Sequence, residues 1–188
     1  MDFRNNEAAS GSKGLRNNNP GNFRTGIKWQ GVVGDDGTGF LVFSDITYGL
    51  RAMALNLYND YYIDGITTIS GYINKYAPPS ENNSTAYAAT VADWVGIGVN
   101  DDMDLDAATT EDIIRGQMNV ELGEEYSGMV SDADVAQGVA MIGKFEIDAL
   151  KTIGAVVQNP VKSLIIAGVI AAGIGLYVYE IYKNRKKI

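Results

Sequence analysis

The sequence contains neither cysteine nor histidine. Without cysteine there is no disulfide bond, no thiolate nucleophile and no cysteine-based zinc site. Without histidine, Ser-His-Asp triads, Cys-His pairs and HExxH metal sites are excluded as well. Carboxylates, hydroxyls, lysine and arginine remain for chemistry, so we expect any catalytic group to be an Asp or a Glu and expect no cofactor or metal.

Positive charge is scarce in residues 1–160, which hold ten Lys or Arg against 22 Asp or Glu. Residues 161–188 reverse this balance, with five basic residues against one acidic residue. An acidic body argues against direct binding of nucleic acid, whereas a basic end suits anionic lipid headgroups or packaged DNA. We therefore expect the two parts of the chain to face different surroundings.

Charge is absent from residues 163–179, which read SLIIAGVIAAGIGLYVY. At about 1.5 Å per residue, a helix of this length is near the lower limit for crossing the hydrocarbon core of a bilayer. Tyr177, Tyr179 and Tyr182 lie at or just beyond its end, and a basic segment comes next, as at a membrane interface. The pattern predicts a transmembrane helix over residues 162–182 and a basic tail over residues 183–188. A buried core helix is the alternative.

The remaining chain predicts a mostly helical fold. Residues 1–14 are polar and rich in Ser and Gly, which indicates a flexible arm. Short strands at 22–27 and 39–43 predict a hairpin joined across GVVGDDGTG. Apolar spacing predicts helices at about 46–63, 67–76, 84–95, 109–122 and 132–151. The expected organisation is one domain over residues 15–150, with a linker over residues 151–161.

Three segments carry a family resemblance: GLRNNNPGNFR, FLVFSDITYGLRA and INKYAPPSENNSTAYAATVADWVGIG. They are similar to a family of small phage and prophage proteins, often described as structural or virion-associated lytic proteins. These proteins resemble lytic transglycosylases and glucosaminidases of the lysozyme-like superfamily. The resemblance implies a lysozyme-like α+β fold with a sugar-binding cleft. A lytic domain joined to a membrane anchor also resembles the virion transglycosylases of phages with an internal membrane.

Cleavage of a glycosidic bond requires a general acid, and lytic transglycosylases are known for using one Glu. Glu121 is the first candidate, because IIRGQMNVELGEEYS resembles the segment that holds the catalytic Glu of those enzymes. In them that segment precedes the Asn-rich turn, so the likeness requires a permuted arrangement. Glu81 in APPSENNST is the second candidate, and Glu7 is a weaker third. The alternatives are a solvated helix-end carboxylate for Glu121 and a helix-capping role for Glu81.

The resemblance also suggests groups that bind the glycan. Amides near the cleft lip would bond acetamido and hydroxyl groups, and aromatic rings would stack on sugar faces. The expected substrate-binding residues are Asn18, Asn19, Asn22, Trp29, Tyr76 and Tyr87. Asn19 and Asn22 suit a purely structural role equally well, because they flank the Pro-Gly turn.

The leading functional hypothesis is a membrane-anchored phage virion protein that cleaves peptidoglycan during cell entry. It would reside in the internal membrane of the virion, and in the host membrane during assembly. Its expected partners are peptidoglycan, the lipid membrane, and the capsid or other virion membrane proteins, with the basic tail near packaged DNA. One alternative is a non-catalytic virion protein that links membrane to capsid. Another is a cellular envelope protein with a periplasmic binding domain.

Overall fold

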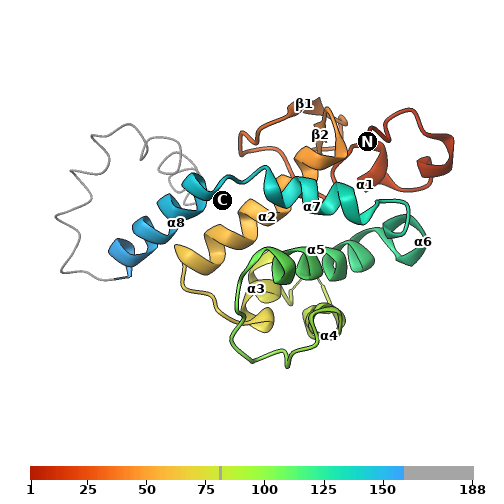
Figure 1. Ribbon diagram of the computed structural model, residues 1–188. Helices are drawn as coiled ribbons and strands as arrows, with labels where there is room; N and C mark the ends of the chain where they lie inside the picture. The colour runs from red at the N-terminus through yellow and green to blue at the C-terminus, as the bar shows by residue number, and fades with distance from the viewer. Residues whose placement is uncertain (81, 159–188) are drawn as a thin grey trace.

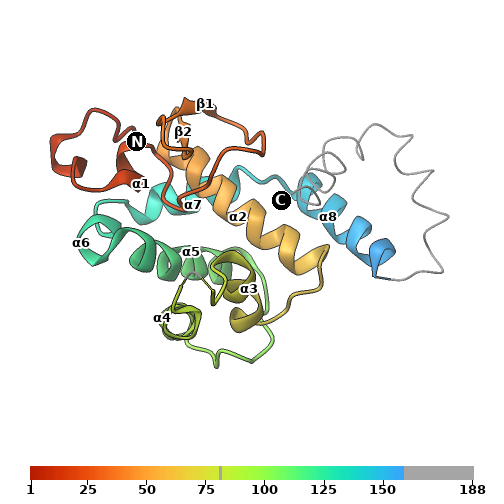
Figure 2. The same cartoon turned by 180° about the vertical axis from the view of Figure 1, so that it is seen from behind.

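A long helix, α2 (Ile46–Tyr62), runs through the middle of the molecule and is buried along most of its length. The computed structural model, which describes residues 1–80 and 82–158, packs the other elements around it (Figures 1 and 2). Asp45 begins α2 by accepting a hydrogen bond from the Thr47 amide at 3.0 Å, which satisfies one of the free N–H groups of the first turn. Most of its buried residues are apolar, and the buried Arg51 and Asn59 donate hydrogen bonds inside the protein.

The elements around α2 are mostly short helices. The N-terminal region contributes η1 (Glu7–Ala9) and α1 (Lys13–Arg16), and the sheet contains β1 (Val32–Asp35) and β2 (Leu41–Phe43). The helices that follow are α3 (Ile69–Tyr76), α4 (Ser84–Val95), α5 (Ala107–Leu122), α6 (Glu124–Ser127), α7 (Asp132–Ala140) and α8 (Lys144–Val157). Helices α2, α3, α4 and α5 lie close to their predicted ranges, so a mostly helical body is confirmed.

The two-stranded antiparallel sheet differs from the predicted hairpin. The first strand, β1, lies in the segment predicted to be the connection, and it pairs with β2 through a bulge between Val32 and Gly34. The predicted strand at 22–27 forms only an isolated bridge from Arg24 to Phe40. Positive φ angles at Asn22 and Gly26 interrupt its extended conformation. The carboxylate of Asp36 closes the turn by accepting hydrogen bonds from backbone amides.

The predicted flexible arm, residues 1–14, is instead part of the folded body. Phe3 and Ala9 are fully buried in the core. The amide of Phe3 donates to the side-chain oxygen of Asn18 at 2.9 Å, and Asn6 and Ser12 cap η1 and α1. The polar composition was misleading because these polar side chains satisfy local backbone groups, which leaves the few apolar residues to fill the core.

The buried Asn-rich turn joins the N-terminal segment to the sheet. The side-chain amide of Asn18 donates to the Phe43 carbonyl at 3.2 Å, and that of Asn19 donates to the Leu41 carbonyl at 2.9 Å. Gly49 lets α2 approach this turn, since a Cβ there would lie 2.2 Å from the Asn18 carbonyl oxygen. The turn therefore fixes the position of β2 relative to α2.

The predicted helix at 132–151 is two helices, and residues 151–157 of the predicted linker belong to the second of them. The chain leaves α7 at Met141 and starts α8 after Gly143, whose extended conformation interrupts the helix. The change of direction returns α8 to α2. There the buried Arg51 donates to both carboxylate oxygens of Glu146, at 3.0 and 2.8 Å. The folded body thus extends beyond residue 150, to the end of α8.

The predicted fold class, a lysozyme-like domain with one C-terminal transmembrane helix, requires correction. Among residues 1–80 and 82–158, no helix combines the length and the apolar content that crossing a bilayer requires. The fold that the structure shows is a mostly helical body with a two-stranded sheet. The segments predicted as membrane helix and basic tail, residues 162–188, lie outside the described residues.

Removal of the Asn18 side chain should destabilise the protein markedly. Asn18→Ala leaves the buried Phe3 amide and Phe43 carbonyl without their present partner, which predicts a loss of about 3 kcal/mol in the free energy of unfolding. Asn18 has φ +48°, a conformation that glycine adopts more easily than alanine. The free energy of unfolding of Asn18→Gly should therefore exceed that of Asn18→Ala by about 1 kcal/mol. Urea unfolding measures both differences.

The exposed Asn5 provides the control, because Asn5→Ala removes the same chemical group from the surface and should leave the urea midpoint close to that of the unmodified chain. Equal stability of Asn18→Ala and Asn5→Ala would contradict the structural role assigned to the buried turn.

Candidate functional site

Glu121 lies in the last turn of α5, where it receives hydrogen bonds from two distant segments. The side-chain amide of Asn22 donates to one carboxylate oxygen at 2.8 Å, and the hydroxyl of Tyr87 donates to the other at 2.9 Å. Asn22 follows the Asn-rich turn and has φ +48°, which aims its side chain back toward α5. Tyr87 comes from α4. The fold therefore brings three of the predicted site residues together.

Burial raises the pKa of Glu121 above the ordinary value of 4.5, and the hydrogen bonds from Asn22 and Tyr87 only partly oppose this shift. The protonated carboxyl thus stabilises the fold at low pH, and this contribution disappears as the pH rises through the folded-state pKa. A carboxyl group whose pKa is raised in this way holds its proton to a higher pH than an exposed glutamate does, which is the property that a general acid requires.

An aromatic cluster provides the apolar surroundings of this carboxyl group. The ring of Tyr76 meets those of Tyr87 and Phe23 edge to face, with centroids 6.4 and 6.1 Å apart. The Tyr76 hydroxyl donates to the carbonyl of Gly21. Burial raises the pKa of both Tyr76 and Tyr87 well above that of a free tyrosine. Both hydroxyls therefore stay protonated and act as donors beside Glu121.

Glu121 forms part of the wall of an open cleft of about 940 Å³. This volume lies in the range typical of binding sites for small molecules. Aromatic rings, side-chain amides and charges of both signs line the cleft: Lys13, Gly21, Asn22, Phe23, Arg24, Ile27, Phe40, Asn56, Asp60, Asp64, Lys75, Tyr76, Ala77, Pro78, Asn82 and Glu121. Amides that bond hydroxyl and acetamido groups, together with apolar rings, suit a carbohydrate chain.

The structure places the other predicted site residues differently. Asn18 and Asn19 are fully enclosed, and their amides bond the backbone of the turn and of β2, which was the structural alternative for Asn19. Trp29 is buried and packs against Phe23 with ring centroids 5.2 Å apart. None of these three side chains lines the described cleft. Glu7 is exposed in η1 and does not line it either, and Glu81 lies outside the described residues.

Two cations of the cleft, Lys13 and Arg24, were not among the predicted site residues. Lys13 belongs to the segment predicted to be flexible, and Arg24 belongs to the predicted strand at 22–27. Both lie against the ring of Phe40. The alternation in residues 39–43 was a usable signal, because Leu41 and Phe43 point into the core and so place Phe40 on the opposite face.

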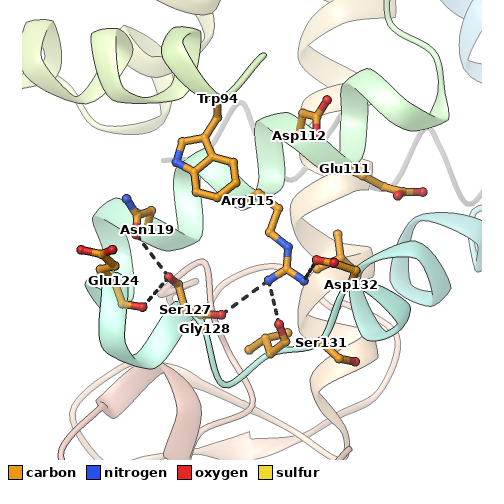
Figure 3. A pocket seen from close by; sticks show the side chains of 12 residues that line it. Trp94, Glu111, Asp112, Arg115, Asn119, Glu124, Ser127, Gly128, Ser131 and Asp132 are labelled. Carbon is orange, nitrogen blue, oxygen red and sulfur yellow. Dashed lines mark hydrogen bonds and ion pairs between the residues drawn. The ribbon is translucent and has the colours of Figure 1, made fainter. Parts of the chain in front are cut away.

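A second hollow, of about 900 Å³, lies between α4, α5 and the α6–α7 corner. Figure 3 shows Trp94 on one side and Arg115 extending across toward Ser131 and Asp132. Arg115 donates to the carbonyl of Val130 at 2.7 Å and to the carboxylate of Asp132. Its guanidinium therefore joins α5 to the start of α7, which is a structural role. No three metal-ligating side chains converge anywhere in the described part of the chain.

No protein-family profile matches the chain. The chain is 35% identical over 124 residues to protein P5 of Pseudoalteromonas phage PM2, and the match covers 63% of this chain and 74% of P5. This chain belongs to the family of phage protein P5. The expectation of a phage protein is thereby confirmed, whereas the lytic activity implied by the resemblance stays a prediction.

Removal of the Tyr87 hydroxyl should raise the pKa of Glu121 further. Tyr87→Phe keeps the apolar ring and deletes one of the two hydrogen bonds that stabilise the carboxylate. A carbon-13 NMR titration of the Glu121 side chain measures the shift. Asn82→Ala is the matched control, because Asn82 lines the same cleft, and it should leave the titration unchanged. A lower pKa in Tyr87→Phe would contradict this account of the site.

Arg115→Met should lower the free energy of unfolding by about 2 kcal/mol, because the buried Val130 carbonyl loses its charged donor. Asp132→Asn tests the other bond of the same guanidinium. The Asp132 side chain is 99% exposed, so solvent screens this ion pair and the urea midpoint should barely move. A larger effect of Asp132→Asn than of Arg115→Met would show that the ion pair, rather than the carbonyl contact, joins α5 to α7.

Proposed function

We propose that this chain is a phage virion protein that cleaves the glycan strands of peptidoglycan, with Glu121 as the catalytic acid. One observation carries the proposal. A partly buried carboxyl group of raised pKa forms the wall of a large open cleft, with two hydrogen-bond donors that fix its orientation. Membership of a phage protein family supports a role in the phage particle.

In the proposed first step, protonated Glu121 donates its proton to the oxygen of the scissile glycosidic bond. The bond between that oxygen and the anomeric carbon breaks, and positive charge develops on the sugar that keeps the anomeric carbon. The carboxylate that remains accepts its hydrogen bonds from Asn22 and Tyr87, which stabilise the charge left on Glu121.

In the second step, the Glu121 carboxylate accepts a proton from the hydroxyl group that attacks the anomeric carbon. If the attacking group is water, the result is hydrolysis. If it is the 6-hydroxyl of the same sugar, the result is an anhydro-sugar. In either case Glu121 regains its proton, so the acid is ready for another cycle. Burial of the carboxyl group maintains its raised pKa during this cycle.

Zymography on peptidoglycan tests the proposal with the full chain. The unmodified chain should clear the gel, and Glu121→Gln should reduce the clearing at least about 100-fold, because a side-chain amide has no proton to donate to the leaving oxygen. Glu111→Gln is the matched control, since Glu111 lines the second hollow. Glu81→Gln tests the rival candidate and should retain activity.

The outcomes separate the candidates. Loss of activity in Glu81→Gln with retention in Glu121→Gln would transfer the role of acid to Glu81. No clearing by the folded, unmodified chain would reject the enzymatic proposal and favour the non-catalytic virion protein.

A further inference from the structure

Two cations in the lining of the cleft lie against the same aromatic ring. The ammonium of Lys13 lies 4.2 Å from the centroid of the Phe40 ring, and the guanidinium of Arg24 lies 4.4 Å from the same centroid. The three residues come from α1, from the segment after the Asn-rich turn and from the approach to β2. The fold therefore assembles this group from separate parts of the sequence.

This charge arrangement is unusual for an acidic protein with a net charge of −8. The third cation of the cleft, Lys75, forms ion pairs with Asp60 and Asp64. Lys13 and Arg24 are both exposed and form no ion pair with any residue in the described ranges. The quadrupole of one ring is a weak partner for two cations, so an anionic group is favoured beside them.

Lys13 and Arg24 line the same cleft as Glu121. Gly14, the neighbour of Lys13, packs closely against the end of α5. A Cβ added there would lie only 2.4 Å from the Leu122 side chain and 3.6 Å from the side-chain oxygen of Asn22. Lys13 thus sits on a short helix that touches the same turn of α5 as the candidate acid. A ligand long enough to occupy the cleft reaches both features.

We propose that Lys13 and Arg24, held against Phe40, form an anion-binding subsite for a carboxylate of peptidoglycan. Resting on the function proposed above, this inference goes further by assigning the part of the substrate that carries negative charge. Two sources share that chemistry: the lactyl group of a muramic acid residue without its peptide, and the carboxylates of the peptide stems. A neutral chitin-type oligosaccharide lacks both, so the subsite distinguishes peptidoglycan from uncharged glycans.

Isothermal titration calorimetry with the full chain carrying Glu121→Gln tests the subsite, because that background binds glycan without turnover. The three probes are chitohexaose, peptide-free glycan fragments with free lactyl carboxylates, and glycan fragments that retain their peptide stems. The test variant is Lys13→Gln with Arg24→Gln. The matched control is Lys144→Gln with Lys151→Gln, which removes the same charge from α8, whose residues do not line the cleft.

The test variant should bind at least one carboxylate-bearing probe about tenfold more weakly than its parent, since two charge-assisted contacts are lost. Its affinity for chitohexaose should stay within about twofold of the parent. The affected probe identifies the source of the carboxylate, and added salt should weaken binding of that probe. Lys13→Arg with Arg24→Lys should restore most of the affinity, because it keeps both charges.

Three results would overturn the subsite: equal weakening for chitohexaose and the charged probes, no weakening for either charged probe, or no binding of any probe by the parent. The zymogram with the unmodified chain judges the catalytic proposal separately. Clearing without charge-selective binding rejects the subsite alone, and charge-selective binding without clearing rejects catalysis alone.

Discussion

The buried asparagine run after α1 is the constraint on which the rest of the structure depends. Asn18 and Asn19 place their amides inside the protein, where an unpaired donor or acceptor would be costly, so the surrounding backbone must supply partners. Those partners are the Phe3 amide and the carbonyls of β2, which ties the N-terminal segment and the sheet to one turn. The close approach of α2 at Gly49 then locks the turn against the main helix of the core.

The same turn determines the chemistry of the candidate site. Because Asn18 and Asn19 face inward, the chain leaves the turn with the Asn22 side chain directed at Glu121. The resulting hydrogen bond joins two residues that are 99 positions apart in the sequence. The aromatic cluster around Tyr76 excludes water from this contact, which raises the pKa of Glu121, while the two donors limit the rise. A carboxyl group in this balance holds its proton to a higher pH than an exposed glutamate does, and the two donors stabilise the carboxylate when the proton leaves.

Charge is distributed unevenly along the cleft, and this links the site to the proposed substrate. Lys13 and Arg24 lie against Phe40, Glu121 belongs to the same lining, and Lys75 pairs with acidic residues. The proposed substrate, a glycan that bears carboxylates, would supply an anionic partner for Lys13 and Arg24. The relationship to phage protein P5 places this chain in a phage protein family.

The sequence by itself determined the helices whose signal is local. The spacing of apolar residues predicted α2 and α4 closely. The absence of cysteine and histidine left carboxylates, Glu121 among them, as the candidate catalytic groups. Tertiary structure decided the rest: the burial of residues 1–14, the position of β1, the break at Gly143 and the burial of Asn18 and Asn19. Each depends on contacts between segments that are distant in the sequence. The local pattern of apolar and polar residues does not specify which distant segment will pack against a given residue. The cleft follows the same rule, because Lys13, Arg24 and Glu121 share a surface only after α1 packs against the end of α5.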